Sequence, residues 1–179
     1  MTVFIDRRAG DALGAESRRR RVRETGGALF GFADGDHVVV ACAYGPGPHA
    51  RHRHTSFESH RPTTDAIMAT VREASTQRYR FLGSWHTHPA GAAVPSSRDT
   101  ATAAEIAAEA EVLLPRPLVI IQATRPRVRG AGLAELAAWR WDPGASEMVR
   151  EALESVDLEE RWCPVVAAPG SDPPSMIRG

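Results

Sequence analysis

The chain has 179 residues, in which 22 Lys and Arg balance 22 Asp and Glu, and 42% of the residues are hydrophobic. This size and composition predict one globular domain and exclude a mainly disordered chain. A formal net charge of zero gives no general attraction to nucleic acid or to an anionic membrane, so neither is expected as a partner. No apolar run reaches the roughly 20 residues that span a bilayer, and the N-terminal segment lacks a signal-peptide pattern, so a cytoplasmic protein is expected.

The first part of the chain predicts a short helix among strands. Strands are predicted at 2–5, 27–32 and 37–43, and a helix at 9–21. The helix ends in a run of arginines, which we interpret as a solvated face. The Asp34-Gly35 pair predicts a hairpin between the second and third strands. A loop rich in Gly, Pro, His and Arg follows at 45–62.

The second part alternates helices and strands more regularly. Helices are predicted at 63–77, 97–112 and 146–160, and strands at 79–85, 117–123 and 132–141. The last helix is predicted from Val149, Leu153 and Val156, which stand at helical spacing. The alternation indicates one α/β domain over residues 1–160, with a single mixed β-sheet flanked by helices. Prolines and glycines predict a disordered tail at 161–179.

The stretch with the clearest chemistry runs from Trp85 to Pro89 (WHTHP), and Ser96-x-x-Asp99 follows six residues later. Alternate side chains at the end of a strand share one face, so His86 and His88 are expected to point the same way. The S-x-x-D pattern predicts a capping box that opens a helix and offers Asp99 back toward the histidines. Two histidines and a carboxylate leave a fourth position open, the pattern of a catalytic zinc site, so one Zn²⁺ per chain is predicted at the edge of the sheet.

This spacing resembles the motif of the JAB/JAMM (MPN-plus) metalloproteases, which is an upstream Glu, then H-x-H-P, then S-x-x-D. The upstream residue is present as Glu24, directly before the predicted strand in TGGALFG. The resemblance covers roughly residues 20–125 and implies a cytidine-deaminase-like JAB/MPN fold. It implies that His86, His88 and Asp99 are zinc ligands. It also implies that Glu24 is the general base that passes a proton to the leaving amine, and that Ser96 stabilises the oxyanion.

The elementary chemistry of these residue types agrees with those roles. A carboxylate beside an activated water can accept a proton and then donate it to a leaving group. A hydroxyl donor together with a metal charge stabilises a developing oxyanion. Glu24 follows Arg23 and could simply be a solvated charge. Its position directly before the glycine-rich strand favours the functional interpretation instead.

Among members of that family, the chain resembles the small stand-alone prokaryotic deconjugases. The shared features are ETGGALFG, the Gly45–Pro48 loop, Ser56-Phe57 and G-x-WHTHP. The resemblance implies hydrolysis of the amide or isopeptide bond after the C-terminus of a ubiquitin-like protein, in precursor maturation or deconjugation. It implies as partners that protein, its conjugates, and activating-like and conjugating-like enzymes of one antiviral defence operon. His60 departs from the pattern, because an acidic residue is expected near this position, and the role of the loop stays open.

Three other functions remain open at this stage. The chain could release an adduct from a sulfur-carrier protein in sulfur assimilation. It could also be a non-catalytic scaffold, as relatives without the ligands are. The segment from Pro89 to Ser96 is also similar to RadC-type proteins, which share the fold and the motif spacing. The Glu24 element favours the deconjugase branch over the RadC type.

The remaining chemistry-bearing residues have plainer interpretations. The 45–62 loop holds four histidines, which are His49, His52, His54 and His60. Their spacing fits no metal-ligand pattern, so we interpret the loop as a solvated basic loop or as a lip of the site that contacts substrate. Trp85 abuts the first ligand and is expected to wall the metal pocket, while the other tryptophans pack the core: Trp139, Trp141 and Trp162. Cys42 and Cys163 predict two reduced thiols and no disulfide framework.

Overall fold

The computed structural model of the chain describes residues 2–20, 22–110, 114–124 and 135–158. Its helices are α1 (Arg7–Arg20), α2 (Arg61–Ala74) and α3 (Ser97–Ala108). Its strands are β1 (Thr2–Asp6), β2 (Gly26–Asp34), β3 (His37–Tyr44), β4 (Arg51–His52), β5 (Phe57–Glu58), β6 (Arg80–Pro89), β7 (Leu118–Thr124), β8 (Glu135–Asp142) and β9 (Glu147–Val156). In this part of the chain, no helix combines the length and the apolar character that crossing a membrane requires.

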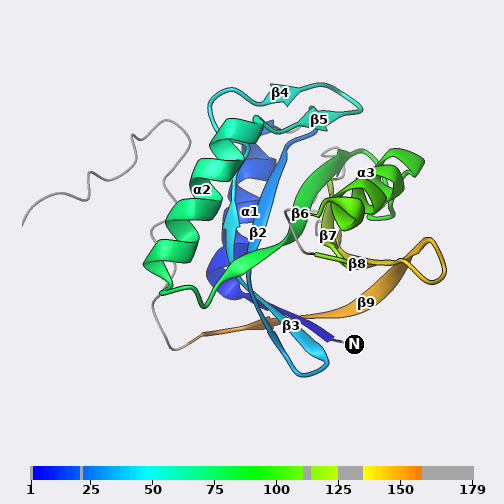
Figure 1. The fold of residues 1–179 in the computed structure, drawn as a ribbon. Coiled ribbons are helices and arrows are strands. Elements are labelled where there is room, and N and C mark those ends of the chain that lie inside the picture. Colours follow the sequence, from blue (N-terminus) through cyan, green and yellow to red (C-terminus); the bar gives the residue numbers. More distant parts are fainter. Residues whose placement is uncertain (1, 21, 111–113, 125–134, 159–179) are drawn as a thin grey trace, which may run out of the picture.

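Seven strands close into a barrel in the order β1-β3-β2-β6-β7-β8-β9, and β4 and β5 form a separate small hairpin (Figure 1). The sheet is mixed, because β6 pairs antiparallel with β2 and parallel with β7. β1 is parallel to both β3 and β9, and its pairing with β9 closes the barrel. The predicted mixed sheet with flanking helices is therefore confirmed, whereas its closure is a property that the sequence did not predict.

The helices cover the two faces of the sheet. Leu13 of α1 packs with Leu29 and Ile120, and the residues beside these two on their strands point the opposite way. On that opposite face, Val71 of α2 packs against Phe30, and Ala103 of α3 packs against residues of β7 and β8. α2 and α3 thus lie over one face of the strands around β6 and leave a gap between them, while α1 covers the other face.

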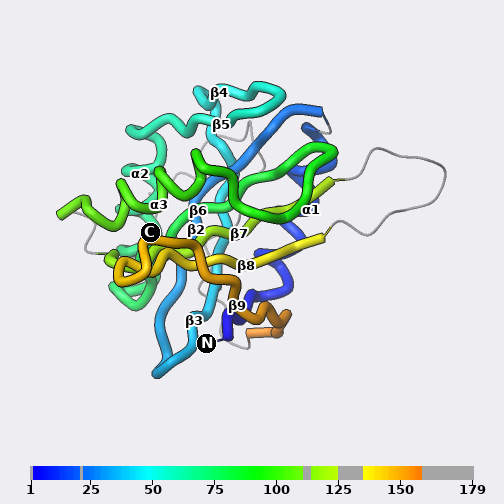
Figure 2. The backbone as a smooth tube through the Cα atoms, turned by 90° about the vertical axis from the view of Figure 1, so that its right-hand side faces the viewer, coloured from blue at the N-terminus to red at the C-terminus, as the bar shows by residue number. Residues whose placement is uncertain are grey.

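The helix predicted at 146–160 is wrong, because Glu147–Val156 forms strand β9. Its first half pairs with β8 and its second half with β1, so it bridges the two ends of the sheet (Figure 2). Glu151 is buried and forms an ion pair with Arg140 of β8, at 2.7 Å. Pairing with β8 and β1 satisfies the hydrogen-bonding groups of the β9 backbone. This pairing outweighs the helical spacing of the apolar residues, because strand preference depends on tertiary context.

Most other predicted elements are confirmed with shifted ends. The 132–141 segment forms β8 from Glu135 onward, which removes its helical alternative for the described residues. The strand predicted at 79–85 runs on to Pro89, so both histidines of WHTHP lie within β6. The 45–62 loop contains β4 and β5, and α2 begins within its last residues. Cys42 is buried in β3, whereas Cys163, Trp162 and the predicted tail at 161–179 lie outside the described residues.

A candidate metal centre between β6 and α3

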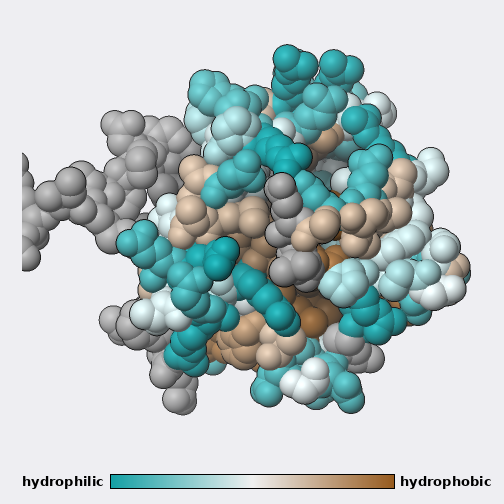
Figure 3. All heavy atoms as spheres, in the orientation of Figure 1, coloured by the Kyte–Doolittle hydropathy of each residue, from teal (hydrophilic) through white to brown (hydrophobic). Residues whose placement is uncertain are grey.

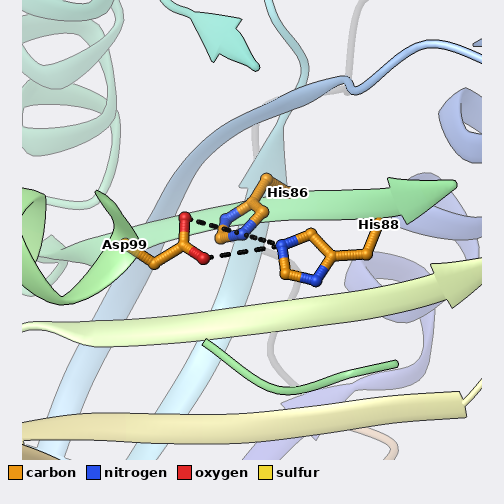
Figure 4. Close-up of side chains that lie close together, drawn as sticks. All are labelled: His86, His88 and Asp99. Carbon is orange, nitrogen blue, oxygen red and sulfur yellow. Dashed lines mark hydrogen bonds and ion pairs between the residues drawn. The ribbon is translucent and has the colours of Figure 1, made fainter. Parts of the chain in front are cut away.

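Strand β6 sets the positions of the two candidate histidine ligands. His86 and His88 project from the same face of the strand, and their Nε2 atoms lie 3.0 Å apart (Figure 4). The expectation of a shared face is confirmed. The expectation that the site lies at the edge of the sheet is wrong, because β6 is paired on both sides, with β2 and with β7.

The second ring nitrogen of His88 fixes the orientation of its imidazole. His88 Nδ1 lies 2.9 Å from the carbonyl oxygen of Ala92. A carbonyl oxygen only accepts, so Nδ1 carries the proton and the neutral ring presents a lone pair at Nε2. The loop that supplies this carbonyl is itself held by Trp139, whose Nε1 donates to the Ala93 carbonyl at 2.9 Å. This arrangement is typical of metal-binding histidines. One ring nitrogen faces the metal, and the N–H of the other nitrogen donates to a protein group that fixes the orientation of the ring.

Asp99 reaches the histidines from the first turn of α3. Ser96 is the N-cap of that helix, and the capping box predicted from S-x-x-D is confirmed. Asp99 Oδ2 accepts hydrogen bonds from the backbone N–H of Ser96 at 2.6 Å and from Ser96 Oγ at 2.7 Å. Asp99 Oδ1 instead lies 3.2 Å from His86 Nε2. Oδ2 also lies 3.5 Å from His88 Nε2. The carboxylate therefore caps the helix through Oδ2 and directs each of its oxygens toward one histidine.

The side chains of His86, His88 and Asp99 lie close enough for their charges to interact. Their side chains are only 11% (His86), 15% (His88) and 16% (Asp99) exposed. Burial by itself would raise the pKa of Asp99, but hydrogen bonds from the two histidines and from Ser96 hold that pKa far below its usual range. The hydrogen bond to Asp99 raises the pKa of His88, against the opposing effect of its burial. Asp99 is therefore an anion over the whole physiological pH range.

The donor atoms fit a divalent metal ion. One atom each from His86, His88 and Asp99 lie within 4.8 Å of one another, and two of them are imidazole nitrogens that face each other. Two such nitrogens can share only one proton, whereas a cation placed among the three atoms would be attracted by all of them. Two imidazoles and a carboxylate are ligands typical of zinc.

The five side chains with a predicted catalytic or metal-binding role line one cleft of 460 Å³. They are Glu24, His86, His88, Ser96 and Asp99. Phe57 of β5, Thr64 of α2 and Ile106 of α3 line the same cleft, so it occupies the gap between the two helices. Burial raises the pKa of the Glu24 carboxyl, although positive charge on His86 and His88 would lower it. A raised pKa makes a carboxylate a better proton acceptor.

The segment that carries Glu24 is attached to β6 by side chains that the sequence did not single out. The backbone N–H of Thr25 donates to Thr87 Oγ1 at 3.1 Å, and the N–H of Thr87 donates to the Thr25 carbonyl at 2.8 Å. Thr25 Oγ1 donates to Glu16 Oε1 of α1 at 3.2 Å. Glu16 is buried at 6% exposure, shortly before the arginine run that we interpret as a solvated face. No spacing rule connects these residues, because they meet only in the folded chain.

The two glycines after Thr25 also follow from close packing. A Cβ atom on Gly26 would lie 2.3 Å from the carbonyl oxygen of Trp85, and one on Gly27 would lie 1.8 Å from the carbonyl oxygen of Tyr44. β2 therefore approaches both neighbouring strands too closely for any side chain at these positions. This explains why glycines follow Glu24-Thr25 in the sequence.

The other predicted residues have mostly structural roles. Trp85 lines the cleft as expected, and it is 2% exposed with Nε1 donating to the Tyr44 carbonyl at 2.8 Å. Trp141 is buried in the core, as predicted. Within the 45–62 loop, His54 lines the cleft, which supports the interpretation of this loop as a lip of the site. The arginines at the end of α1 are exposed, as a solvated face requires, and these are Arg18, Arg19 and Arg20.

Comparison with known proteins identifies the family. The family model described as prokaryotic homologs of the JAB domain matches residues 6–142, well over half of the chain. The chain therefore belongs to the prokaryotic JAB domain homologues. The matched range contains the strand with both histidines, the capping box of α3 and the segment with Glu24.

A solved structure shows the same fold at low sequence identity. The solution structure of protein DSY2949 from Desulfitobacterium hafniense superposes with a TM-score of 0.66 and 17% identity. The match covers 87% of this chain and 94% of that one. The likeness supports the fold described above. None of the curated proteins compared with the chain matches it.

Proposed function

We propose that the chain is a zinc-dependent hydrolase that cleaves the amide or isopeptide bond after the C-terminus of a ubiquitin-like protein. The observation that carries the proposal is the placement of Glu24 in the same cleft as the His86, His88 and Asp99 group. Membership of the JAB family supports a metal-dependent hydrolase, since JAB domains are often metalloisopeptidases. The proposed catalytic domain spans residues 1–160 and has the cytidine-deaminase-like topology of that family. Its proposed partners are the ubiquitin-like protein, its conjugates, and activating-like and conjugating-like enzymes of the same operon.

Each candidate residue has a distinct task in this proposal. A zinc ion bound by His86, His88 and Asp99 would supply a Lewis acid that polarises the scissile carbonyl and lowers the pKa of a water molecule. The Glu24 carboxylate accepts the proton that the attacking water loses, and then donates it to the nitrogen of the leaving amine. Ser96 Oγ, whose single proton points to Asp99 Oδ2 in this structure, turns that proton to the carbonyl oxygen as negative charge develops on it.

The shape of the cleft agrees with an extended peptide as substrate. It lies between α2 and α3, and its lining includes apolar side chains of Phe57, Phe81 and Ile106. Small residues line its floor near β6, among them Gly27 and Ala28 of β2. We therefore expect the C-terminal tail of the ubiquitin-like protein to lie along this cleft, with the scissile bond next to the metal ligands.

The test is cleavage of ubiquitin-like proteins, fused through their C-terminal glycine to a reporter protein, by wild type and Glu24→Gln. The Gln side chain keeps the size of Glu24 but cannot accept and return a proton. We expect Glu24→Gln to bind zinc and to fold as the wild type does, and to lose cleavage by at least about a hundredfold. Glu105→Gln, a matched change at an exposed position of α3, is expected to cleave normally. Equal cleavage by Glu24→Gln and wild type would contradict the proposed mechanism.

A further inference from the structure

The backbone of Glu24 is held by one short hairpin, residues 51–58, which contains β4 and β5. Glu24 lies between α1 and β2, outside any helix or strand. Its N–H donates to the carbonyl oxygen of Arg53 at 2.7 Å. Its carbonyl oxygen lies 3.0 Å from Nδ1 of His52. Two consecutive residues of the 51–58 hairpin therefore satisfy both backbone polar groups of the proposed general base.

The bond from His52 has a defined direction. A carbonyl oxygen can only accept, so Nδ1 of His52 must carry a proton and donate it to Glu24. The hairpin forms a second bond of the same kind two residues further on, where His54 Nδ1 lies 2.8 Å from the Val22 carbonyl. His52 is half-buried, whereas His54 is exposed. The two histidines thus bind the segment that carries Glu24 at two carbonyls, and only the His52 bond falls on Glu24 itself.

Hydrogen bonds and a ring contact within the 51–58 hairpin hold His52 in place. Its strands pair Arg51 with Glu58 and His52 with Phe57, and Arg53 N–H donates to the Ser56 carbonyl at 2.9 Å. The ring of His52 packs on the ring of Phe57 at a centroid distance of 5.5 Å. Phe57 lines the cleft from β5. In the view of Figure 3, hydrophilic side chains gather at the top of the molecule, over this hairpin.

We propose that His52 is a positioning residue for Glu24, acting through the hydrogen bond from Nδ1 to the Glu24 carbonyl oxygen. This inference rests on the proposed function, because it concerns the general base of that reaction. The other side of the Glu24 segment is fixed by Thr25 through Thr87 and Glu16. With the His52 bond removed, the peptide group between Glu24 and Thr25 loses its anchor on the hairpin side. The carboxylate then samples orientations from which proton transfer is slow, and small displacements of catalytic groups reduce rates strongly.

Three variants separate the hydrogen bond from the ring. His52→Phe keeps a ring against Phe57 and removes the donor. His52→Asn removes the ring and restores a donor, because its amide nitrogen is attached to Cγ as Nδ1 is in histidine. His37→Phe is the matched control, since His37 is an exposed histidine of β3 that does not line the cleft.

Two measurements are made on each full-length variant. The first is kcat and KM for release of aminomethylcoumarin from a peptide that ends in Gly-Gly. The second is the hydrogen-exchange rate of the Glu24 amide, measured by NMR, which reports the segment without requiring activity. We expect His52→Phe to lower kcat by about tenfold with KM nearly unchanged, and to speed Glu24 amide exchange by about fivefold. We expect His52→Asn to recover most of both effects, and His37→Phe to cause less than a twofold change in kcat.

The outcomes distinguish this inference from the proposed function. Wild type that binds zinc but releases no coumarin would count against the proposed function on this probe, and the exchange rates would still decide the role of His52. Unchanged kcat and unchanged exchange in His52→Phe would overturn the positioning role. A raised KM with unchanged kcat would also overturn it, because His52 would then contact the substrate. Failure of His52→Asn to recover the exchange rate would show that the ring matters rather than the bond.

Discussion

Ser96 caps α3 in this structure and has a second, proposed task in catalysis, and one pair of substitutions separates the two tasks. Its hydroxyl caps α3, where Oγ accepts from the Asp99 N–H at 3.3 Å. The same hydroxyl donates to Asp99 Oδ2 at 2.7 Å and lies at the cleft, where it is proposed to stabilise the oxyanion. Ser96→Ala removes both tasks. Ser96→Gly removes the hydroxyl but keeps a residue that is tolerated as an N-cap.

The two tasks differ in expected magnitude. Replacing an N-cap serine by alanine costs about 1 kcal/mol of the free energy of unfolding, and replacing it by glycine costs only a few tenths. Ser96 is exposed, so water substitutes for its bond to Asp99 and adds little to this cost. In a domain of this size, 1 kcal/mol corresponds to a shift in Tm of about 3 °C. Loss of one oxyanion donor costs about a hundredfold or more in kcat.

The assay compares Tm and kcat for wild type, Ser96→Ala, Ser96→Gly and Ser97→Ala. Ser97 is the exposed neighbour of Ser96, and its substitution is the matched control. We expect both Ser96 variants to lose about a hundredfold in kcat. Only Ser96→Ala should lower Tm by about 3 °C. If Ser96→Gly keeps the kcat of the wild type, Ser96 has no part in the chemistry and serves only as a helix cap.

Two further predictions concern the metal ligands and the closure of the barrel. The hydrogen bond to Asp99 raises the pKa of His88, and a proton on His88 competes with the metal ion. The zinc affinity should therefore fall by about tenfold per pH unit as the pH falls through that raised pKa. Calorimetric titrations in buffers from pH 6 to 8 measure this, and a pH-independent affinity would contradict it. Glu151→Leu should cost about 3 kcal/mol in the free energy of unfolding, because it removes the buried carboxylate that pairs with the half-buried guanidinium of Arg140. Adding Arg140→Met should recover most of that loss in denaturant unfolding, and a single variant as stable as the wild type would refute the role of the ion pair.

The sequence predicted most of the fold because local signals and tertiary structure agree in most segments. The Asp34-Gly35 pair marks the turn between β2 and β3, which pair in antiparallel register as expected. The error at β9 has a definite physical cause. Helical spacing of three apolar residues is a local signal, whereas β9 is determined by pairing with β8 and β1, and β1 lies about 150 residues earlier in the sequence. Closure of the barrel follows from that same pairing, so the sequence could not reveal it either.

The sequence predicted those residues of the candidate site that stand at a characteristic spacing. The two histidines share a face because strand side chains alternate, and Asp99 is placed by a capping box that its own sequence encodes. The supporting residues lacked any such signal. Glu16 is contributed by α1, Thr87 by β6, and His52 by the loop that the sequence left without a role. Their partners in the Glu24 segment are distant in sequence for His52 and Thr87, and only the folded chain brings them into contact.

The proposed function depends above all on a zinc ion bound by His86, His88 and Asp99. The most direct measurement is the metal content per chain, by elemental analysis of gently purified wild type and His88→Ala. We expect about one zinc per chain in the wild type and almost none in the variant. A folded wild-type protein that holds no zinc, even after zinc is added back, would contradict this expectation and leave the proposed hydrolase without its metal.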